Sequence, residues 1–181
     1  MADNYLEKKM EEYRRGTGVK AARKLSPTGE RRGMVSLKID ELRVFVSDAS
    51  TNNGAAIVRR LRDEGCKVAF ASNDDKAGRN LAQASGARHY PTTFKGSVVD
   101  DIVKIWGGID VLVATDNIRI DNVDVESVIL IDKSPGIMHR GDIRVNAINT
   151  TGLTSDEIAH LCLLLCLKDS ACINGVVLGK T

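Results

Sequence analysis

The sequence lacks the long apolar runs, the paired cysteines and the signal segment that mark several classes of protein. Its longest apolar run, residues 161–167, is far too short to span a bilayer, and residues 1–9 contain no apolar stretch of the kind found in secretory signals. The four cysteines show no Cys-x-x-Cys spacing, which favours free thiols in a reducing compartment over a disulfide framework. We therefore expect a soluble cytoplasmic protein that does not act at a membrane.

A strong excess of one charge is also missing. Lysine and arginine total 26 against 24 acidic residues, a net charge of +2. Basic residues do gather near the N-terminus, but no aromatic side chain that could stack on a base lies among them; they are Lys20, Arg23, Lys24, Arg31 and Arg32. The sequence therefore predicts no nucleic-acid partner.

The chain divides by composition at about residue 40. Residues 1–40 are charged and contain one candidate for a short amphipathic helix, residues 4–15, with Tyr5, Leu6, Met10 and Tyr13 near helical spacing. Residues 41–181 hold most of the branched apolar residues and are long enough for one hydrophobic core. We expect a charged N-terminal extension followed by a single domain.

Apolar strands alternate with amphipathic helices from residue 42 onward. Such alternation with short connections predicts an α/β fold with a mostly parallel sheet of about seven strands, in a three-layer, doubly wound, Rossmann-like arrangement. The expected strands are residues 42–47, 67–71, 88–91, 109–113, 127–131, 143–148 and 173–178, and the expected helices are residues 53–64, 75–85, 97–106 and 155–168.

The alternation fails on both sides of the fifth expected strand. Residues 114–126 are polar and show no amphipathic period, and residues 132–142 are too few for a long crossover helix. The sequence therefore predicts that the crossover helices around the fifth strand are missing. Either a bare loop joins strands five and six in parallel, or the two strands form a hairpin around Pro135 and Gly136.

Four stretches resemble the short-chain dehydrogenase/reductase family and occur in that family's order. They are Val46-Ser-Asp-Ala-Ser-Thr-Asn-Asn-Gly54, Gly108-Ile-Asp-Val-Leu-Val-Ala-Thr-Asp-Asn-Ile118, Ile143-Arg-Val-Asn-Ala-Ile-Asn149 and Ile173-Asn-Gly-Val-Val-Leu178. The resemblance implies a Rossmann fold with NADP or NAD as cofactor. It places the cofactor-binding residues at Ser47, Ser50, Thr51, Asn52, Asn53, Gly54, Ser72, Asn73 and Asn117.

The chain departs from the family where cofactor and catalysis are concerned. Asp48 and Asn52 stand where two phosphate-loop glycines are expected, and a carboxylate at Asp48 would repel a pyrophosphate. No tyrosine follows the fifth strand, so the family's Tyr-x-x-x-Lys segment, which supplies the proton for carbonyl reduction, is absent. Ser134, or Lys133 beside it, matches the catalytic serine position only roughly, and we interpret it as a turn residue. We predict no catalytic residue.

No metal site is predicted, because His160 and Cys162 point to different faces of one helix and Cys166 shares the apolar face. The resemblance also implies a homodimer formed through the segment between Ser155 and Leu178, with Leu161, Leu164 and Leu165 as contacts. A further protein partner is compatible with this assignment.

Three functions follow from these observations. The first is a degenerate member of the family, a pseudoenzyme with a structural or regulatory role and residual nucleotide binding. The alternative is an NAD(P)-dependent oxidoreductase that borrows its proton donor from Tyr5 or Tyr13. A third is a binding module that holds another phosphate-bearing ligand through the backbone at Thr51, Asn52 and Asn53.

Overall fold

A computed structural model describes residue 39 and residues 41–115, 124–134 and 143–180 of the chain. The chain divides into one unit of residues Met1–Ser36 and a second of residues Leu37–Thr181, and all described residues belong to the second. The helix expected at residues 4–15, Asn117 and the Pro135–Gly136 turn therefore lie outside the described residues.

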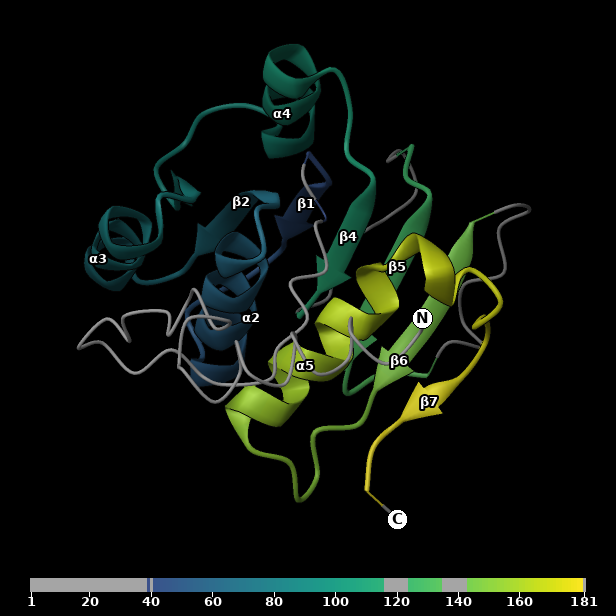
Figure 1. The fold of residues 1–181 in the computed structure, drawn as a ribbon. Coiled ribbons are helices and arrows are strands. Elements are labelled where there is room, and N and C mark those ends of the chain that lie inside the picture. Colours follow the sequence, from purple (N-terminus) through teal and green to yellow (C-terminus); the bar gives the residue numbers. More distant parts are fainter. Residues whose placement is uncertain (1–38, 40, 116–123, 135–142, 181) are drawn as a thin grey trace, which may run out of the picture. The chain divides into compact units, whose positions relative to one another are not determined.

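The described unit is built on a seven-stranded parallel sheet in the order β3-β2-β1-β4-β5-β6-β7 (Figure 1). Every neighbouring pair of strands is parallel, so the predicted α/β, doubly wound fold is confirmed. The strands are β1 (Arg43–Val46), β2 (Lys67–Ser72), β3 (Arg88–Pro91), β4 (Val111–Ala114), β5 (Ser127–Ile131), β6 (Arg144–Ile148) and β7 (Val177–Leu178).

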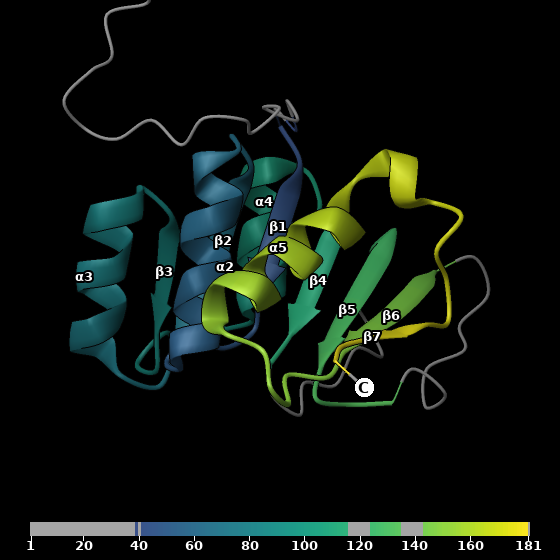
Figure 2. The ribbon, with the colours of Figure 1, turned by 60° about the horizontal axis from the view of Figure 1, so that its bottom comes forward.

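Helices cover both faces of the sheet, but unequally (Figure 2). Helices α2 (Asn52–Asp63), α3 (Asp75–Ser85) and α5 (Ser155–Cys166) pack on one face. Among the described helices, α4 (Val98–Trp106) alone packs on the other. This unequal cover agrees with the prediction that crossover helices are missing beside β5, since the described parts of the connections into and out of β5 contain no helix.

The central strands are apolar on both faces because helices or loops cover both sides. Val44 and Val46 of β1 face α2 and α5, whereas Phe45 between them faces α4. All residues of β4 and β5 are buried. The continuous apolar runs in the sequence therefore correspond to strands in the middle of the sheet.

Local sequence signals explain where the helices begin and end. The side chains of Thr51, Asp74, Ser97 and Thr154 each accept a hydrogen bond from a backbone N–H in the first turn of α2, α3, α4 and α5, respectively. At the other end, Gly86 and Gly107 have the left-handed backbone angles that stop α3 and α4. The bounds of α2, α3 and α4 therefore lie within one residue of those predicted, whereas α5 ends two residues earlier than expected.

Two details of the second half differ from, or go beyond, the sequence prediction. Strands β5 and β6 are parallel, with Ser127 opposite Arg144 and Ile131 opposite Ile148, so the hairpin alternative is wrong. Strand β7 has two residues instead of the expected six. The reason lies with two side chains. Asn146 donates to Ile173 O and accepts from Val176 N–H, and Asn174 accepts from Val145 N–H. Side chains therefore replace part of the backbone ladder there, although Gly175 N–H still donates to Val145 O at 2.9 Å.

No helix in the described part of the chain is long and apolar enough to cross a membrane.

Candidate functional site

The predicted site residues lie at the carboxyl ends of β1, β2 and β4, which are adjacent in the sheet. The strand order reverses between β1 and β4, because α2 leads from β1 to one side and β4 begins the other half of the sheet. In open parallel sheets a ligand binds at such a reversal point, outside the carboxyl ends of the strands. The fold therefore directs attention to the loop after β1.

Ser47 and Thr115 close the ends of β1 and β4 against each other. The Thr115 N–H donates to Ser47 Oγ at 3.0 Å, and the two side-chain oxygens lie 3.2 Å apart. The Thr115 hydroxyl also donates to Asp48 O at 2.7 Å and accepts from the Asp48 N–H at 2.9 Å. Thr115 thus holds the first turn of the loop on the end of β4.

The carboxylate of Asp48 is occupied by donors of its own chain. Oδ1 accepts from the Ser50 N–H at 2.9 Å and from the Ser50 hydroxyl at 2.6 Å, and Oδ2 accepts from Asn73 Nδ2 at 3.2 Å. A carboxylate accepting several hydrogen bonds is well stabilised as an anion. Asp48 therefore places a negative charge inside the loop that would have to receive a phosphate.

Ser50, Ser72 and Asn73 form one hydrogen-bonded group beside Asp48. The Asn73 N–H donates to Ser50 Oγ at 2.6 Å, and Ser50 Oγ lies 3.2 Å from Ser72 Oγ. The Ser72 hydroxyl also contacts the backbone of Asp74, whose side chain caps α3. The structure thus brings three predicted site residues together and joins them to the start of α3.

The start of α2 retains one feature of a nucleotide loop. A Cβ atom added at Gly54 would lie 2.5 Å from Asp48 O and 2.8 Å from Ala49 Cα, so this position requires glycine for the helix to approach the loop. Thr51 is used as the helix cap, and Asn53 accepts from the Ser155 hydroxyl of α5 at 2.7 Å. Asn52 is exposed.

The loop does not turn in the way that its asparagines suggest. Both Asn52 and Asn53 belong to α2, and among the described non-glycine residues only Glu41 and Asp132 have positive φ. Neither asparagine therefore supplies the left-handed backbone angles that a glycine would provide. The turn is formed instead by Asp48, Ser50 and Thr51, which accept backbone N–H groups with their side chains.

A second carboxylate lies at the same edge of the sheet, after β5. Asp132, with φ of 56°, accepts from the Thr150 N–H at 2.8 Å and from the Thr150 hydroxyl at 2.8 and 2.9 Å. This contact joins the ends of β5 and β6. Ser134, the residue nearest the expected catalytic serine, is exposed beyond it. Sequence reasoning did not identify Asp132 or Thr115, although each directly follows a strand.

One charged residue of α4 contacts β3. Asp101 accepts from the Tyr90 hydroxyl at 2.6 Å and from Arg88 at 3.1 Å. Burial is the main cause that raises the pKa of Tyr90 to about 12, and the bond to Asp101 adds to it. The cluster fixes α4 to β3 and lies away from the loop after β1.

No group of three or more His, Cys, Asp or Glu side chains within the described residues could hold a metal ion. Cys66, Cys162 and Cys166 are buried in the core beneath α2 and α5. Burial raises the pKa of the Cys66 thiol to about 12, and a hydrogen bond with Cys162, together with burial, raises the pKa of Cys166. Cys66 and Cys166 are therefore protonated, and all three side chains pack as small apolar groups.

The strand order and the placing of the helices define a fold class, the Rossmann-type α/β folds. No family model and no curated protein matches the sequence. Solved structures do. BdcA from E. coli superposes with a TM-score of 0.58 at 17% identity, covering 79% of this chain and 100% of that one. A short-chain dehydrogenase/reductase from Serratia marcescens gives 0.59 at 17%, covering 79% and 97%.

A further structure, BdcA in complex with NADPH, gives a TM-score of 0.57 at 16% identity and covers 77% of this chain and 93% of that one. The chain thus has a Rossmann fold like that of short-chain dehydrogenases/reductases, as the resemblance in its sequence implied. At such identity the likeness concerns the fold.

Proposed function

We propose that this chain is a degenerate Rossmann protein that does not perform the standard carbonyl reduction, binds NADP(H) or NAD(H) only weakly, and has a structural or regulatory role. The observation that carries this proposal is the position of the Asp48 carboxylate. It takes the Ser50 N–H, the Ser50 hydroxyl and the Asn73 amide as its own donors. A phosphate at the same loop would need donors of this kind.

The electrostatic cost of replacing these contacts is large. Two unit charges about 4 Å apart repel each other by about 4 kcal/mol at an effective dielectric constant of about 20. Since about 1.4 kcal/mol corresponds to a factor of ten in affinity, an unscreened repulsion of this size weakens phosphate binding by about a thousandfold. The absence of any tyrosine after β5 removes the usual proton donor as well.

Calorimetric titration with NADPH and NADH at millimolar ligand tests the proposal. We expect no measurable heat with the wild type and measurable binding with Asp48→Gly. Asp48→Asn removes the charge but keeps an oxygen that can still accept from Ser50 and Asn73. It therefore separates the effect of charge repulsion from the effect of competition for these hydrogen-bond donors. Asp63→Asn, an exposed acid at the far end of α2, is the control and should behave as the wild type. Micromolar binding by the wild type would refute the proposal.

A second candidate is an NAD(P)-dependent oxidoreductase with a borrowed proton donor. It is favoured by the close approach that Gly54 still permits, and by the fact that BdcA, a structural neighbour, was solved with NADPH. The borrowed donor would be Tyr5 or Tyr13, both outside the described residues. Oxidation of NADPH by wild-type protein with a panel of carbonyl compounds, abolished in the Tyr5→Phe or Tyr13→Phe variant, would establish it.

The structural role that we propose includes a homodimer formed by α5 and β7. Leu164 is 41% exposed on α5 and Val177 is 55% exposed on β7, the strand at the edge of the sheet. Leu165 is completely buried in the core, so it is not available as a contact, contrary to the expectation from the sequence. The four free cysteines favour a reducing compartment, and we place the protein in the cytoplasm.

A further inference from the structure

The side chain of His89 on β3 fills a space on the surface of α3 that exists because residue 78 is glycine. A Cβ atom added at Gly78 would lie 2.3 Å from His89 Nε2 and 2.6 Å from Cε1, so the imidazole fills the space where any other residue of α3 would place a side chain. On its other side, the ring stacks on Phe70 of β2, with 5.2 Å between ring centroids and an interplanar angle of 28°. The ring therefore forms part of the contact between α3 and the sheet.

One nitrogen of this ring has no hydrogen-bond partner. Nε2 is inaccessible to solvent and no donor or acceptor lies within reach of it. A neutral imidazole tolerates this position, because an unprotonated ring nitrogen against apolar groups loses only one weak acceptor contact. A protonated ring tolerates it badly, since a buried N–H without an acceptor costs about 1–3 kcal/mol, and more when charged.

We propose that the contact between α3 and the sheet is a pH-sensitive device: His89 is held as a neutral ring between Gly78 and Phe70, and mild acid loosens α3 by protonating it. The device lies outside the loop after β1 and does not depend on whether that loop binds a nucleotide. It provides a form of regulation through the stability of one helix.

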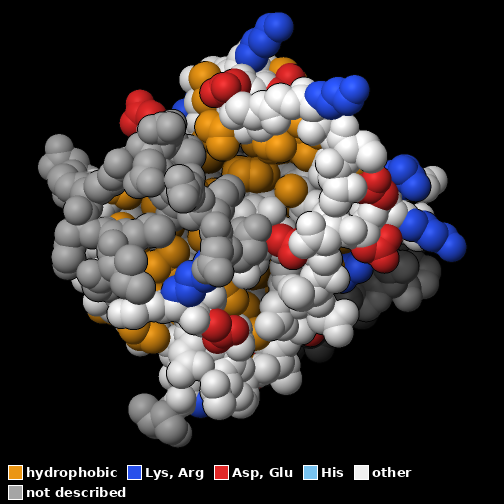
Figure 3. All heavy atoms as spheres, turned by 180° about the vertical axis from the view of Figure 1, so that it is seen from behind, with side chains coloured by type: hydrophobic (Ala, Val, Ile, Leu, Met, Phe, Trp, Pro, Cys, Tyr) orange, Lys and Arg blue, Asp and Glu red, His pale blue; other side chains and the backbone are white. Residues whose placement is uncertain are grey.

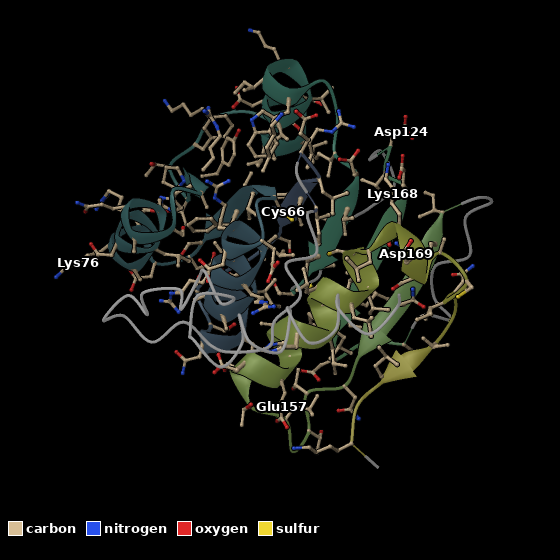
Figure 4. The ribbon with its side chains drawn as sticks, viewed as in Figure 1. Cys66, Lys76, Asp124, Glu157, Lys168 and Asp169 are labelled. Atoms are coloured by element: carbon tan, nitrogen blue, oxygen red, sulfur yellow. The ribbon has the colours of Figure 1, made fainter. Side chains whose placement is uncertain are left out.

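The charged side chains around His89 do not reverse its preference for the neutral form. Two charged side chains of α3 act on the ring, with Asp75 favouring protonation and Arg79 opposing it. Asp75 is already engaged by the Thr92 N–H at 3.0 Å. Lys76 of the same helix points away from the sheet (Figure 4). On β3 itself, Arg88 is directed to Tyr90 and Asp101 beside α4, and Phe70 of β2 carries no charge.

Burial is the largest influence, and it lowers the pKa of His89 below its ordinary value of 6.5. The native state therefore binds this proton less readily than the unfolded chain does. The contribution of the neutral ring to stability is complete above about pH 6.5 and is lost as the pH falls from there toward the lowered pKa.

Loosening of α3 would reach the loop after β1. The helix is capped by Asp74, the residue that Ser72 contacts, and Asn73 next to it donates to Asp48 and Ser50. When α3 moves, the donors that Asn73 supplies to Asp48 move with it. Acid thereby weakens the hydrogen bonds that Asn73 donates to Asp48 and Ser50 at neutral pH.

Hydrogen exchange read by mass spectrometry at about pH 7.5 and about pH 5.5, corrected for the intrinsic rates, tests the proposal. In the wild type, peptides covering α3 should lose protection at the lower pH. The loss should be at most about tenfold, because about pH 5.5 lies only about one unit below the ordinary pKa of 6.5 that the ring has in the unfolded chain. His89→Leu should remove this pH dependence. His160→Leu, which removes an exposed histidine of α5, should retain it.

An NMR titration of the wild-type histidines keeps the proposal falsifiable if His89→Leu does not fold. The signal of His89, assigned with His139→Leu and His160→Leu as references, should titrate below 6.5. Titration at or above that value would overturn the proposal. So would equal pH dependence of α3 protection in wild type and His89→Leu.

Discussion

The hydroxyl of Thr115 donates to the carbonyl of Asp48 at 2.7 Å and accepts from the N–H of the same residue at 2.9 Å. One side chain at the end of β4 therefore satisfies both backbone groups of the residue that begins the loop after β1. Because the chain turns away from the sheet at Asp48, no strand can supply these hydrogen bonds. The Thr115 side chain therefore continues the hydrogen bonding between β1 and β4 one residue beyond the strands.

Replacing Thr115 by valine keeps its shape and removes the hydroxyl. The N–H and carbonyl of Asp48 then lose their partner in a half-buried setting, and we expect a loss of about 1–3 kcal/mol in the free energy of unfolding. Thr115→Ser keeps the hydroxyl and should lose much less. Urea denaturation of the two variants provides the comparison; equal stability would show that the contact contributes nothing.

Gly54→Ala should be destabilising for a steric reason. The new methyl group would lie 2.5 Å from a backbone oxygen, so either α2 or the loop must shift. Overpacking of this kind costs about 1–3 kcal/mol. Asn52→Ala changes an exposed neighbour on the same turn and should stay within about 0.5 kcal/mol of the wild type. A Gly54→Ala variant as stable as Asn52→Ala would mean that the loop after β1 shifts to accommodate the methyl group without a measurable cost in stability.

Glu157 links stability to acid pH. Its carboxylate caps α5 at Thr154 and accepts from Lys180, at the opposite end of α5 from Lys168 and Asp169 (Figure 4). The backbone N–H of Thr154 is the main cause that lowers the pKa of Glu157 from 4.5 to about 2. Its stabilising effect is therefore present above 4.5 and lost as the pH falls toward about 2.

Glu157→Gln should accordingly unfold with a weaker dependence on pH than the wild type between about pH 5 and about pH 3. Denaturant midpoints across this range measure the effect, with Asp63→Asn as the control. A parallel pH dependence in wild type and Glu157→Gln would exclude this carboxylate as a source of acid sensitivity.

The proposed dimer offers a paired test. Leu164→Asp combined with Val177→Asp places two charges on the exposed apolar surface of α5 and β7, and light scattering should show a fall from dimer to monomer mass. The matched control uses α4, where Val103 is 43% and Ile105 is 47% exposed. Apolar atoms also gather around α4 on the rear face (Figure 3). If only Val103→Asp with Ile105→Asp dissociates the protein, α4 forms the interface instead.

Much of the fold could be predicted because it rests on local signals. Helix α3 begins after its Asp74 cap and ends at Gly86, and both bounds follow from residue types that favour those positions. Strand β5 follows from an unbroken apolar run. In contrast, the direction of β6 relative to β5 depends on a connection near the minimum length for a parallel crossover, so the sequence left it open.

The candidate site was harder to predict, since it depends on contacts between distant residues. The sequence showed that Asp48 would repel a phosphate, but not that Asn73, 25 residues further on, would donate to it. The contact of Asp101 with Tyr90 could not be predicted for the same reason, because the two residues lie 11 positions apart on different elements, α4 and β3.

The contact between Asn53 and Ser155 joins residues 102 positions apart, at the beginnings of two helices that pack together. During synthesis at about 5–20 residues per second, α2 therefore waits roughly 5 to 20 seconds before α5 leaves the ribosome. Throughout that interval, the apolar side of α2 that α5 will cover has no permanent neighbour. The growing chain should consequently depend on chaperones that shield helices during translation, and substitutions that weaken α5 should reduce yield in cells more than they reduce stability in the test tube.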